Sequence, residues 1–416
     1  MPDALARVIA ESRAGRAVAI PSVCSAHPEV LAATLRLAQT LDRAVLIEAT
    51  SNQVNQEGGY TGLTPAAFIA FVRDIAAATG TDPDRILFGG DHLGPQAWRR
   101  LPAAQAMARA HAMVADYAGA GFAKLHLDCS EGCAGERAQL GDELTVPRTA
   151  ALAQTAAAHA RDPLFVVGTE VPPPGGARHD EGAEIAPTRP AAARATLDAH
   201  MAAFRDIGRI GALVVQPGVE FSPMEVHHLP LTRDPGLRAA IAHHPGVVLE
   251  AHSTDYQRPA AYPRLAELGF AFQKIGPALT FAWREAVYAL DWLAEAAGWG
   301  PAILRPAMER LMTADPAMWQ GHYHGPDLEL QRHFGLADRI RYYWPRPEAQ
   351  AALAALRDRL AGRRLPAPLL WQAFPPEVLD RAESIPGDRL QALAAARVQA
   401  ALAPCVFAPA TPQATR

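Results

Sequence analysis

The chain has 416 residues, of which 50% are hydrophobic and 20% are charged, a composition that supports an ordinary folded core and does not favour disorder. Its formal net charge of −4 comes from interspersed acids and bases, which argues against nucleic acid and anionic membranes as partners. The sequence has neither the apolar stretch of about 18 residues that spans a membrane nor the apolar region of a secretory signal. Its 4 cysteines are too scattered for a disulfide framework, so we expect a cytoplasmic protein.

Eight short apolar runs alternate with stretches of helical periodicity along the first 300 residues. The runs lie at residues 17–23, 44–50, 85–90, 122–128, 164–170, 211–217, 246–252 and 271–276. They are continuously apolar, which is typical of parallel strands buried on both faces. The pattern predicts an α/β fold, a (β/α)₈ TIM barrel over residues 1–300. An open doubly wound sheet is the alternative, but no glycine fingerprint follows the first run and the chain has no P-loop motif.

Residues 301–416 form mostly helical patterns interrupted by proline. We expect a C-terminal helical extension packed on the barrel, with a frayed C-terminal tail; a separate domain is the alternative. Two segments of the extension, WQGHYHG (319–325) and ADRIRYYWP (337–345), concentrate histidine, arginine and tyrosine. They are either a lid or anion clamp over the site or an aromatic packing seam.

Polar residues follow the apolar runs, and in a barrel the C-terminal strand ends converge on one rim where active sites lie. These residues are Cys24, Glu48, Asn52, Gln53, Asp91, His92, His126, Asp128, Glu170, Gln216, His252, Ser253, Thr254 and Lys274. Short polar residues at such positions can simply cap the next helix. Histidine is a poor cap, however, so three histidines at the same rim favour a catalytic site.

The sequence FGGDHLGP puts Asp91 beside His92 directly after a strand. We predict that His92, Glu170 and His252 bind a divalent metal ion, because imidazole and carboxylate ligands suit such ions. Zn²⁺ is the favoured ion, and Mn²⁺, Mg²⁺, Co²⁺ and Ni²⁺ are alternatives; an ion-free polar network is the other interpretation. His126 points to the same layer, either as a hydrogen-bond partner behind the ligands or as a substrate contact.

Lys274 ends the eighth run just before a helix, where barrel enzymes often bind phosphate. We predict that it binds phosphate together with Ser253 and Thr254, and a Schiff-base lysine is the alternative. Asn52 and Gln53 are suited to sugar hydroxyls.

The motifs VCSAHPEVL, LIEATSNQVNQEGGYTG, GGDHLGP, GTEVPPPGG, EAHSTDYQ, KIGPALTF and RYYWP resemble the GatZ/KbaZ-like family, named as a subunit of D-tagatose-1,6-bisphosphate aldolase. The resemblance implies a TIM barrel related to class II, metal-dependent aldolases. It also implies that Asp91 is an acid or base and that His92 and His252 are metal ligands. Gln216 stands where a further histidine ligand would be expected, and Glu170 is our substitute.

Proteins similar to this family are named aldolase subunits, kinases or epimerases, so chemistry has to choose between them. The absence of kinase motifs disfavours phosphoryl transfer. C4 of a 2-ketose is not α to the carbonyl, so its inversion needs either oxidation, for which the chain has no nicotinamide fingerprint, or retro-aldol cleavage. Cleavage needs only a metal and acid/base groups, for which Asp91, Asp128 and Glu170 are the candidates. We therefore predict 4-epimerisation of a ketose phosphate; the alternative is an auxiliary subunit of a catalytic tagatose-bisphosphate aldolase partner.

Overall fold

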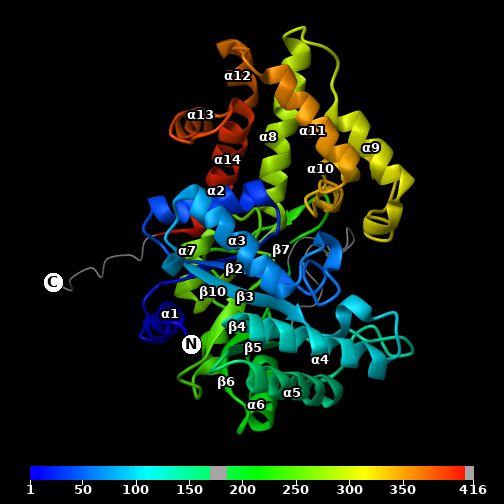
Figure 1. Cartoon of the computed structure of the whole chain (residues 1–416). Helices are drawn as coiled ribbons and strands as arrows, with labels where there is room; N and C mark the ends of the chain where they lie inside the picture. Colours follow the sequence, from blue (N-terminus) through cyan, green and yellow to red (C-terminus); the bar gives the residue numbers. More distant parts are fainter. Residues whose placement is uncertain (169–184, 408–416) are drawn as a thin grey trace, which may run out of the picture.

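Eight parallel strands form a closed barrel, which confirms the predicted fold class (Figure 1). The structure is a computed structural model and describes residues 1–168 and 185–407. The strands are β1 (Ile20–Cys24), β2 (Val45–Thr50), β3 (Ile86–Leu93), β4 (Lys124–Leu127), β5 (Leu164–Gly168), β6 (Arg209–Val214), β9 (Val248–Ala251) and β10 (Phe270–Ile275). They pair in this order around the barrel, and β10 pairs with β1 to close it.

Side-chain alternation along each strand divides the apolar runs between the barrel interior and the surrounding helices. In β2, Leu46 belongs to the interior cluster, whereas Ile47 packs with the helices outside. Leu87, Val248 and Phe272 fill the same interior layer as Leu46. Helix α1 (Asp3–Arg13) adds Leu5, Val8 and Ile9 to this cluster and covers the N-terminal end of the barrel.

Helices α2 (Pro28–Thr40), α3 (Pro65–Thr79), α4 (Ala103–Ala120), α5 (Asp142–His159), α6 (Pro190–Ala203), α7 (Ala261–Glu267) and α8 (Pro277–Ala296) connect or follow the strands. The connection after β6 differs, because it holds the hairpin of β7 (Glu220–Phe221) and β8 (Val226–His227) and a 3₁₀ turn, Leu237–Ile241. Proline, glycine and histidine recur throughout residues 216–246 and interrupt helical periodicity there, which is consistent with a short turn in place of a helix.

The C-terminal extension comprises α9 (Leu304–Ala314), α10 (Leu328–Phe334), α11 (Pro347–Leu360), α12 (Ala367–Ala373), α13 (Pro376–Glu383) and α14 (Arg389–Leu402). It stands above the barrel around α8, and α14 packs against both α8 and α2 (Figure 1). A buried ion pair of 3.0 Å joins Arg284 of α8 to Asp338 of the extension. The barrel and the extension therefore share a packed interface. The expected frayed tail lies outside the described residues beyond residue 407.

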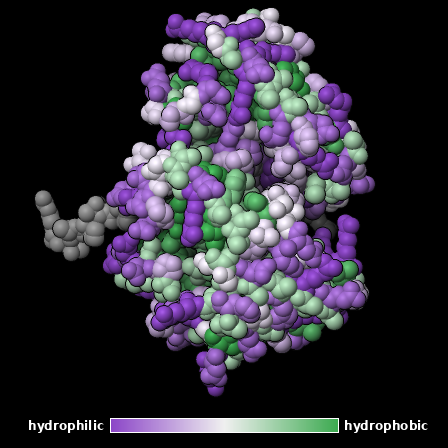
Figure 2. Space-filling model, viewed as in Figure 1, coloured by the Kyte–Doolittle hydropathy of each residue, from purple (hydrophilic) through white to green (hydrophobic). Residues whose placement is uncertain are grey.

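On the face seen in Figure 2, hydrophilic and hydrophobic residues are intermixed. Within the described residues, no helix is both long and apolar enough to cross a membrane.

Candidate active site

A layer of buried charges lies inside the barrel, directly above the apolar layer. Strand alternation directs Glu48, Lys124, Glu250 and Lys274 inward, and each is at most 5% exposed. The Lys124 ammonium lies 2.7 Å from both Glu48 and Glu250. The Lys274 ammonium contacts Glu48, lies 2.7 Å from Asp91 and 3.5 Å from Glu250. These pairings matter because an uncompensated buried charge costs several kcal/mol.

Lys274 is therefore surrounded by carboxylates. Burial alone would lower its pKa, but Asp91, Cys24 and the neighbouring glutamates outweigh burial and raise that pKa well above its usual value. A Schiff-base lysine attacks as the neutral amine, so these contacts disfavour that alternative.

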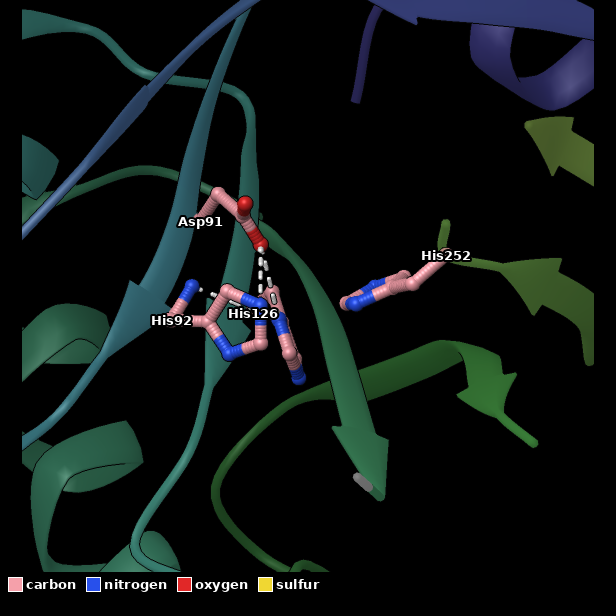
Figure 3. Close-up of side chains that lie close together, drawn as sticks. All are labelled: Asp91, His92, His126 and His252. Atoms are coloured by element: carbon pink, nitrogen blue, oxygen red, sulfur yellow. Dashed lines mark hydrogen bonds and ion pairs between the residues drawn. The ribbon is translucent and has the colours of Figure 1, made fainter. Parts of the chain in front are cut away.

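Three histidines and one carboxylate converge at the rim, above the charged layer (Figure 3). Asp91 and His92 end β3, His126 lies in β4, and His252 follows β9 and points across toward the other three. One ligand atom from each of the four side chains lies within 4.8 Å of every other. The three imidazole rings are mutually 4.8 to 5.1 Å apart between centroids. This geometry brings the predicted ligands His92 and His252 together and adds His126.

Each ring is also fixed from behind by a hydrogen bond. The three bonds join His92 Nδ1 to Asp128 Oδ2 at 2.8 Å, His126 Nε2 to the Gly168 carbonyl at 3.0 Å, and His252 Nε2 to Glu250 Oε1 at 3.0 Å. Because carbonyl and carboxylate oxygens accept, these ring nitrogens donate. Metal-ligating histidines characteristically donate one N–H to such an oxygen. The donor set thus fits a divalent metal ion.

The electrostatics of the cluster favour an added positive charge. Burial would lower the pKa of His92, but the carboxylates of Asp91 and Asp128 outweigh burial and raise that pKa to about 9. Burial likewise opposes ionisation of Asp91, yet His92 and Lys274 hold the Asp91 pKa well below its usual range. A histidine binds a metal in its neutral form, so a metal would replace the His92 proton. With His92 neutral, the four carboxylates of Glu48, Asp91, Asp128 and Glu250 exceed the two ammonium groups of Lys124 and Lys274 by two charges. A divalent cation would balance that excess.

Two residues of the site have left-handed backbone conformations, which non-glycine residues rarely adopt. His92 has a φ of 47° and Ser253 a φ of 52°. The turn at His92 points its backbone N–H toward His126 Nδ1, 3.3 Å away. Strain of this kind is characteristic of functional sites.

The cluster opens into a cavity of about 620 Å³. Among the predicted site residues, its lining includes Asn52, Gln53, Asp91, His92, Asp128, His252, Ser253 and Lys274. His126 is completely buried behind this lining. Glu170, predicted as a metal ligand and catalytic residue, lies outside the described residues.

The groups predicted to bind phosphate after the seventh and eighth strands already have partners within the protein. The Thr254 hydroxyl donates to the Lys274 carbonyl at 2.6 Å, and Ser253 Oγ lies 3.1 Å from Glu220 Oε2. The backbone amides of Gly276 and Ala278, at the start of α8, donate to Asp255 Oδ1 at 2.9 and 2.8 Å. These contacts favour a different location for a bound phosphate.

Gln216 stands where the family resemblance would place a further histidine metal ligand. In the structure, its side chain instead fixes the backbone that follows β6. Its Oε1 accepts the N–H groups of Gly218 and Val219 at 2.8 and 2.9 Å. Lys124 and Glu250 were not identified from the sequence. Their signal is a charged residue two positions before the rim histidines His126 and His252 within an otherwise apolar run.

A family model described as D-tagatose-1,6-bisphosphate aldolase subunit GatZ/KbaZ-like matches residues 5–409. A protein of Agrobacterium fabrum named D-tagatose 6-phosphate 4-epimerase is 50% identical over 387 residues, which cover 89% of this chain and 91% of that protein. The crystal structure of a probable tagatose 6 phosphate kinase from Sinorhizobium meliloti 1021 is 44% identical, with a TM-score of 0.83. That match covers 93% of this chain and 99% of the other. The similarity therefore includes both the barrel and the extension.

Proposed function

The chain belongs to the GatZ/KbaZ-like family, and from this premise we propose that it catalyses metal-dependent 4-epimerisation between D-tagatose 6-phosphate and D-fructose 6-phosphate. The A. fabrum relative carries the name of this activity. The convergence of His92, His126, His252 and Asp91 on one point is the observation that carries our choice, because a purely structural subunit has no need to assemble titratable groups in a cavity.

We assign the metal to His92 and His252, with Asp91 beside them and Glu170 as a further candidate ligand. His126 lies behind them, because its Nδ1 faces the His92 N–H and its Nε2 donates to the Gly168 carbonyl. Zn²⁺ is the favoured ion for such nitrogen and carboxylate donors. A bound divalent ion would act as a Lewis acid on the ketose oxygens, which supplies several kcal/mol of stabilisation to developing negative charge.

We assign removal of the C4 hydroxyl proton to Asp91, since Lys274, 2.7 Å away, keeps this carboxylate ionised at the cavity wall. The C3–C4 bond then breaks, and its electrons move toward the C2 carbonyl. The products are the enediolate of the three-carbon C1–C3 fragment and glyceraldehyde 3-phosphate. Rotation of the aldehyde, readdition to its other face and return of the proton from Asp91 to O4 give the epimer.

Asp128 was a second candidate for proton transfer, but its contacts suggest another role. Its Oδ2 accepts from His92, and its Oδ1 accepts from the amide and hydroxyl of Ser130 at 2.9 and 2.6 Å. We infer that Asp128 orients the His92 ring. Glu170 stays a candidate for the second proton transfer.

The second candidate function is that of an auxiliary subunit, which the family description supports. Such a chain would activate a catalytic tagatose-bisphosphate aldolase partner. The kinase description of the S. meliloti protein finds no support in this sequence, which has neither a P-loop nor a kinase glycine-rich loop with its partner motifs.

Incubation of the purified chain with D-fructose 6-phosphate and Zn²⁺, Mn²⁺, Mg²⁺, Co²⁺ or Ni²⁺ tests the epimerase directly. We expect D-tagatose 6-phosphate to form, and formation under none of these ions would refute the assignment. Triose phosphate released from the 1,6-bisphosphate would indicate an aldolase. Activity seen only as stimulation of an added aldolase would indicate the auxiliary role.

Substrate labelled with deuterium at C4 tests the route of inversion. Retro-aldol cleavage leaves the C4–H bond intact, so the product should retain the deuterium without a primary isotope effect. A primary isotope effect or loss of the label would indicate oxidation at C4 instead.

A further inference from the structure

The cavity has two ends of opposite charge, and the metal-type cluster occupies only the acidic one. Its other side carries four arginines and a histidine, which we call the cationic end: Arg99, Arg100, Arg339, Arg341 and His322. Arg99 and Arg100 precede α4, whereas the other three belong to the extension. The barrel and the extension therefore build this end together.

Arg339 lacks the carboxylate partner that usually accompanies a partly buried arginine. Arg99 pairs with Glu131, but Arg339 forms no ion pair within residues 1–168 and 185–407. Its Nε donates to the Met318 carbonyl, and its guanidinium lies 5.1 Å from the Tyr342 ring centroid. These contacts fix the group in position without neutralising it.

Neighbouring charges reinforce the positive potential. The Arg341 guanidinium lies 4.4 Å from the centroid of the same Tyr342 ring and donates to the backbone carbonyls of Ala337 and Asp338. The pKa of His322 is lowered, because partial desolvation of its exposed ring and the nearby charges of Arg339 and Arg99 disfavour its protonation. His322 is therefore neutral at physiological pH and available to share hydrogen bonds with an anion.

We propose that Arg99, His322 and Arg339 bind the phosphate monoester of the sugar substrate. This inference rests on the proposed function, which places the reacting C2–C4 segment at the acidic end and requires a separate site for the dianion on C6. Guanidinium groups in a fixed orientation suit phosphate oxygens, because each presents several N–H donors in one plane. The alternative location at the start of α8 is already used, since Asp255 accepts the amides of Gly276 and Ala278.

Binding of inorganic phosphate and of D-fructose 6-phosphate, measured by calorimetry on the full chain, tests the assignment. We expect Arg339→Gln and Arg99→Gln each to weaken both ligands by about tenfold or more, the effect of losing a hydrogen bond to a charged group. The matched control is Arg346→Gln, because Arg346 also stacks on a tyrosine of the extension, 4.9 Å from the Tyr343 centroid, but pairs with Asp315 and does not line the cavity.

Arg99 lies on the barrel side, so its variant tests the site even if Arg339→Gln disturbs the extension. Wild-type affinity for phosphate in both variants would overturn the inference. Steady-state kinetics add a second readout: kcat/KM should fall for the phosphorylated ketose and stay unchanged for unphosphorylated D-tagatose or D-fructose. If the wild type turns over no ketose, the proposed function fails, and the phosphate affinities still decide whether the cationic end is an anion site.

Discussion

Replacement of Asp255 with asparagine should stabilise the chain at neutral pH and have little effect near pH 4. Asp255 is 3% exposed and accepts two backbone N–H groups at the start of α8. Burial, only partly offset by these amides, raises its pKa from 3.8 to about 6. An asparagine oxygen can accept the same two N–H groups without bearing a charge.

The direction of this stability change follows from the protonation of Asp255 in the folded and unfolded chains. The folded protein holds the Asp255 proton up to about pH 6, whereas the unfolded chain releases it near 3.8. The contribution of Asp255 to the free energy of unfolding is therefore fully present below its pKa in the unfolded chain. It is lost as the pH rises through its pKa in the folded protein. A shift of about two units corresponds to ~3 kcal/mol, which Asp255→Asn should recover above pH 6.

Urea unfolding of the wild type and Asp255→Asn, followed by tryptophan fluorescence between pH 4 and pH 8, measures the difference in their free energies of unfolding, here called the stability gap. Asparagine and protonated aspartic acid can differ in stability by an amount that does not depend on pH. Such a difference shifts the stability gap equally at every pH, so the change of the gap with pH is the diagnostic quantity. Asp234→Asn is a matched control, because Asp234 Oδ1 accepts the Gly236 N–H at 2.8 Å from an exposed position. A gap that stays constant or narrows as the pH rises would show that the reasoning about Asp255 is wrong.

Four further perturbations probe the site and its support. His92→Ala and chelation should each lower the rate of epimerisation about 100-fold or more and remove the bound metal, as measured by elemental analysis. The control is His111→Ala, which should keep both activity and metal, because the His111 ring contacts Thr155. Metal retained by His92→Ala would argue against His92 as a ligand. Lys274→Met should cost about 3–5 kcal/mol in urea unfolding, because it leaves buried carboxylates unpaired. Arg284→Met should lower the free energy of unfolding by a similar ~3–5 kcal/mol, because it leaves Asp338 unpaired. It should also raise KM for the sugar phosphate, since Asp338 directly precedes Arg339. For Lys274→Met and Arg284→Met alike, a loss below ~1 kcal/mol would contradict the prediction.

The barrel could be predicted because its signal is repeated eight times in short, local windows. The rim could be predicted too, since parallel strands in a barrel all end on one side. Half of the charged layer, Lys124 and Glu250, was missed, because treating each run as apolar averages over its two faces. Lys124 lies two positions before His126, and Glu250 lies two positions before His252. Because every second side chain of a strand points the same way, this spacing is enough to predict that all four face the barrel interior.

The cationic end could not be derived in the same way. Arg339 is more than 200 residues from Asp91 in sequence, and only the packing of the extension onto α8 brings both to one cavity. The residues ADRIRYYWP indicated either an anion clamp or a packing seam. The structure shows aromatic packing, because Arg339 and Arg341 both lie against the Tyr342 ring, and the anion clamp stays a prediction. The sequence did not reveal that Asp255 accepts the α8 amides, because this contact depends on the loop between β9 and α7.

The position of the cationic end bears on the difference between an epimerase and an aldolase. Retro-aldol cleavage of a ketohexose 6-phosphate leaves the phosphate on the C4–C6 aldehyde, which is the fragment that must rotate and add back. A site that holds this phosphate therefore retains the aldehyde while its carbonyl turns, and the acidic end holds the other fragment. Under the proposed function, the extension, through Arg339 and His322, would supply a means of keeping the cleaved product in place, which the barrel rim alone would lack. On this argument, weakening the cationic end should favour aldehyde release over epimerisation, so the same barrel chemistry would yield an aldolase.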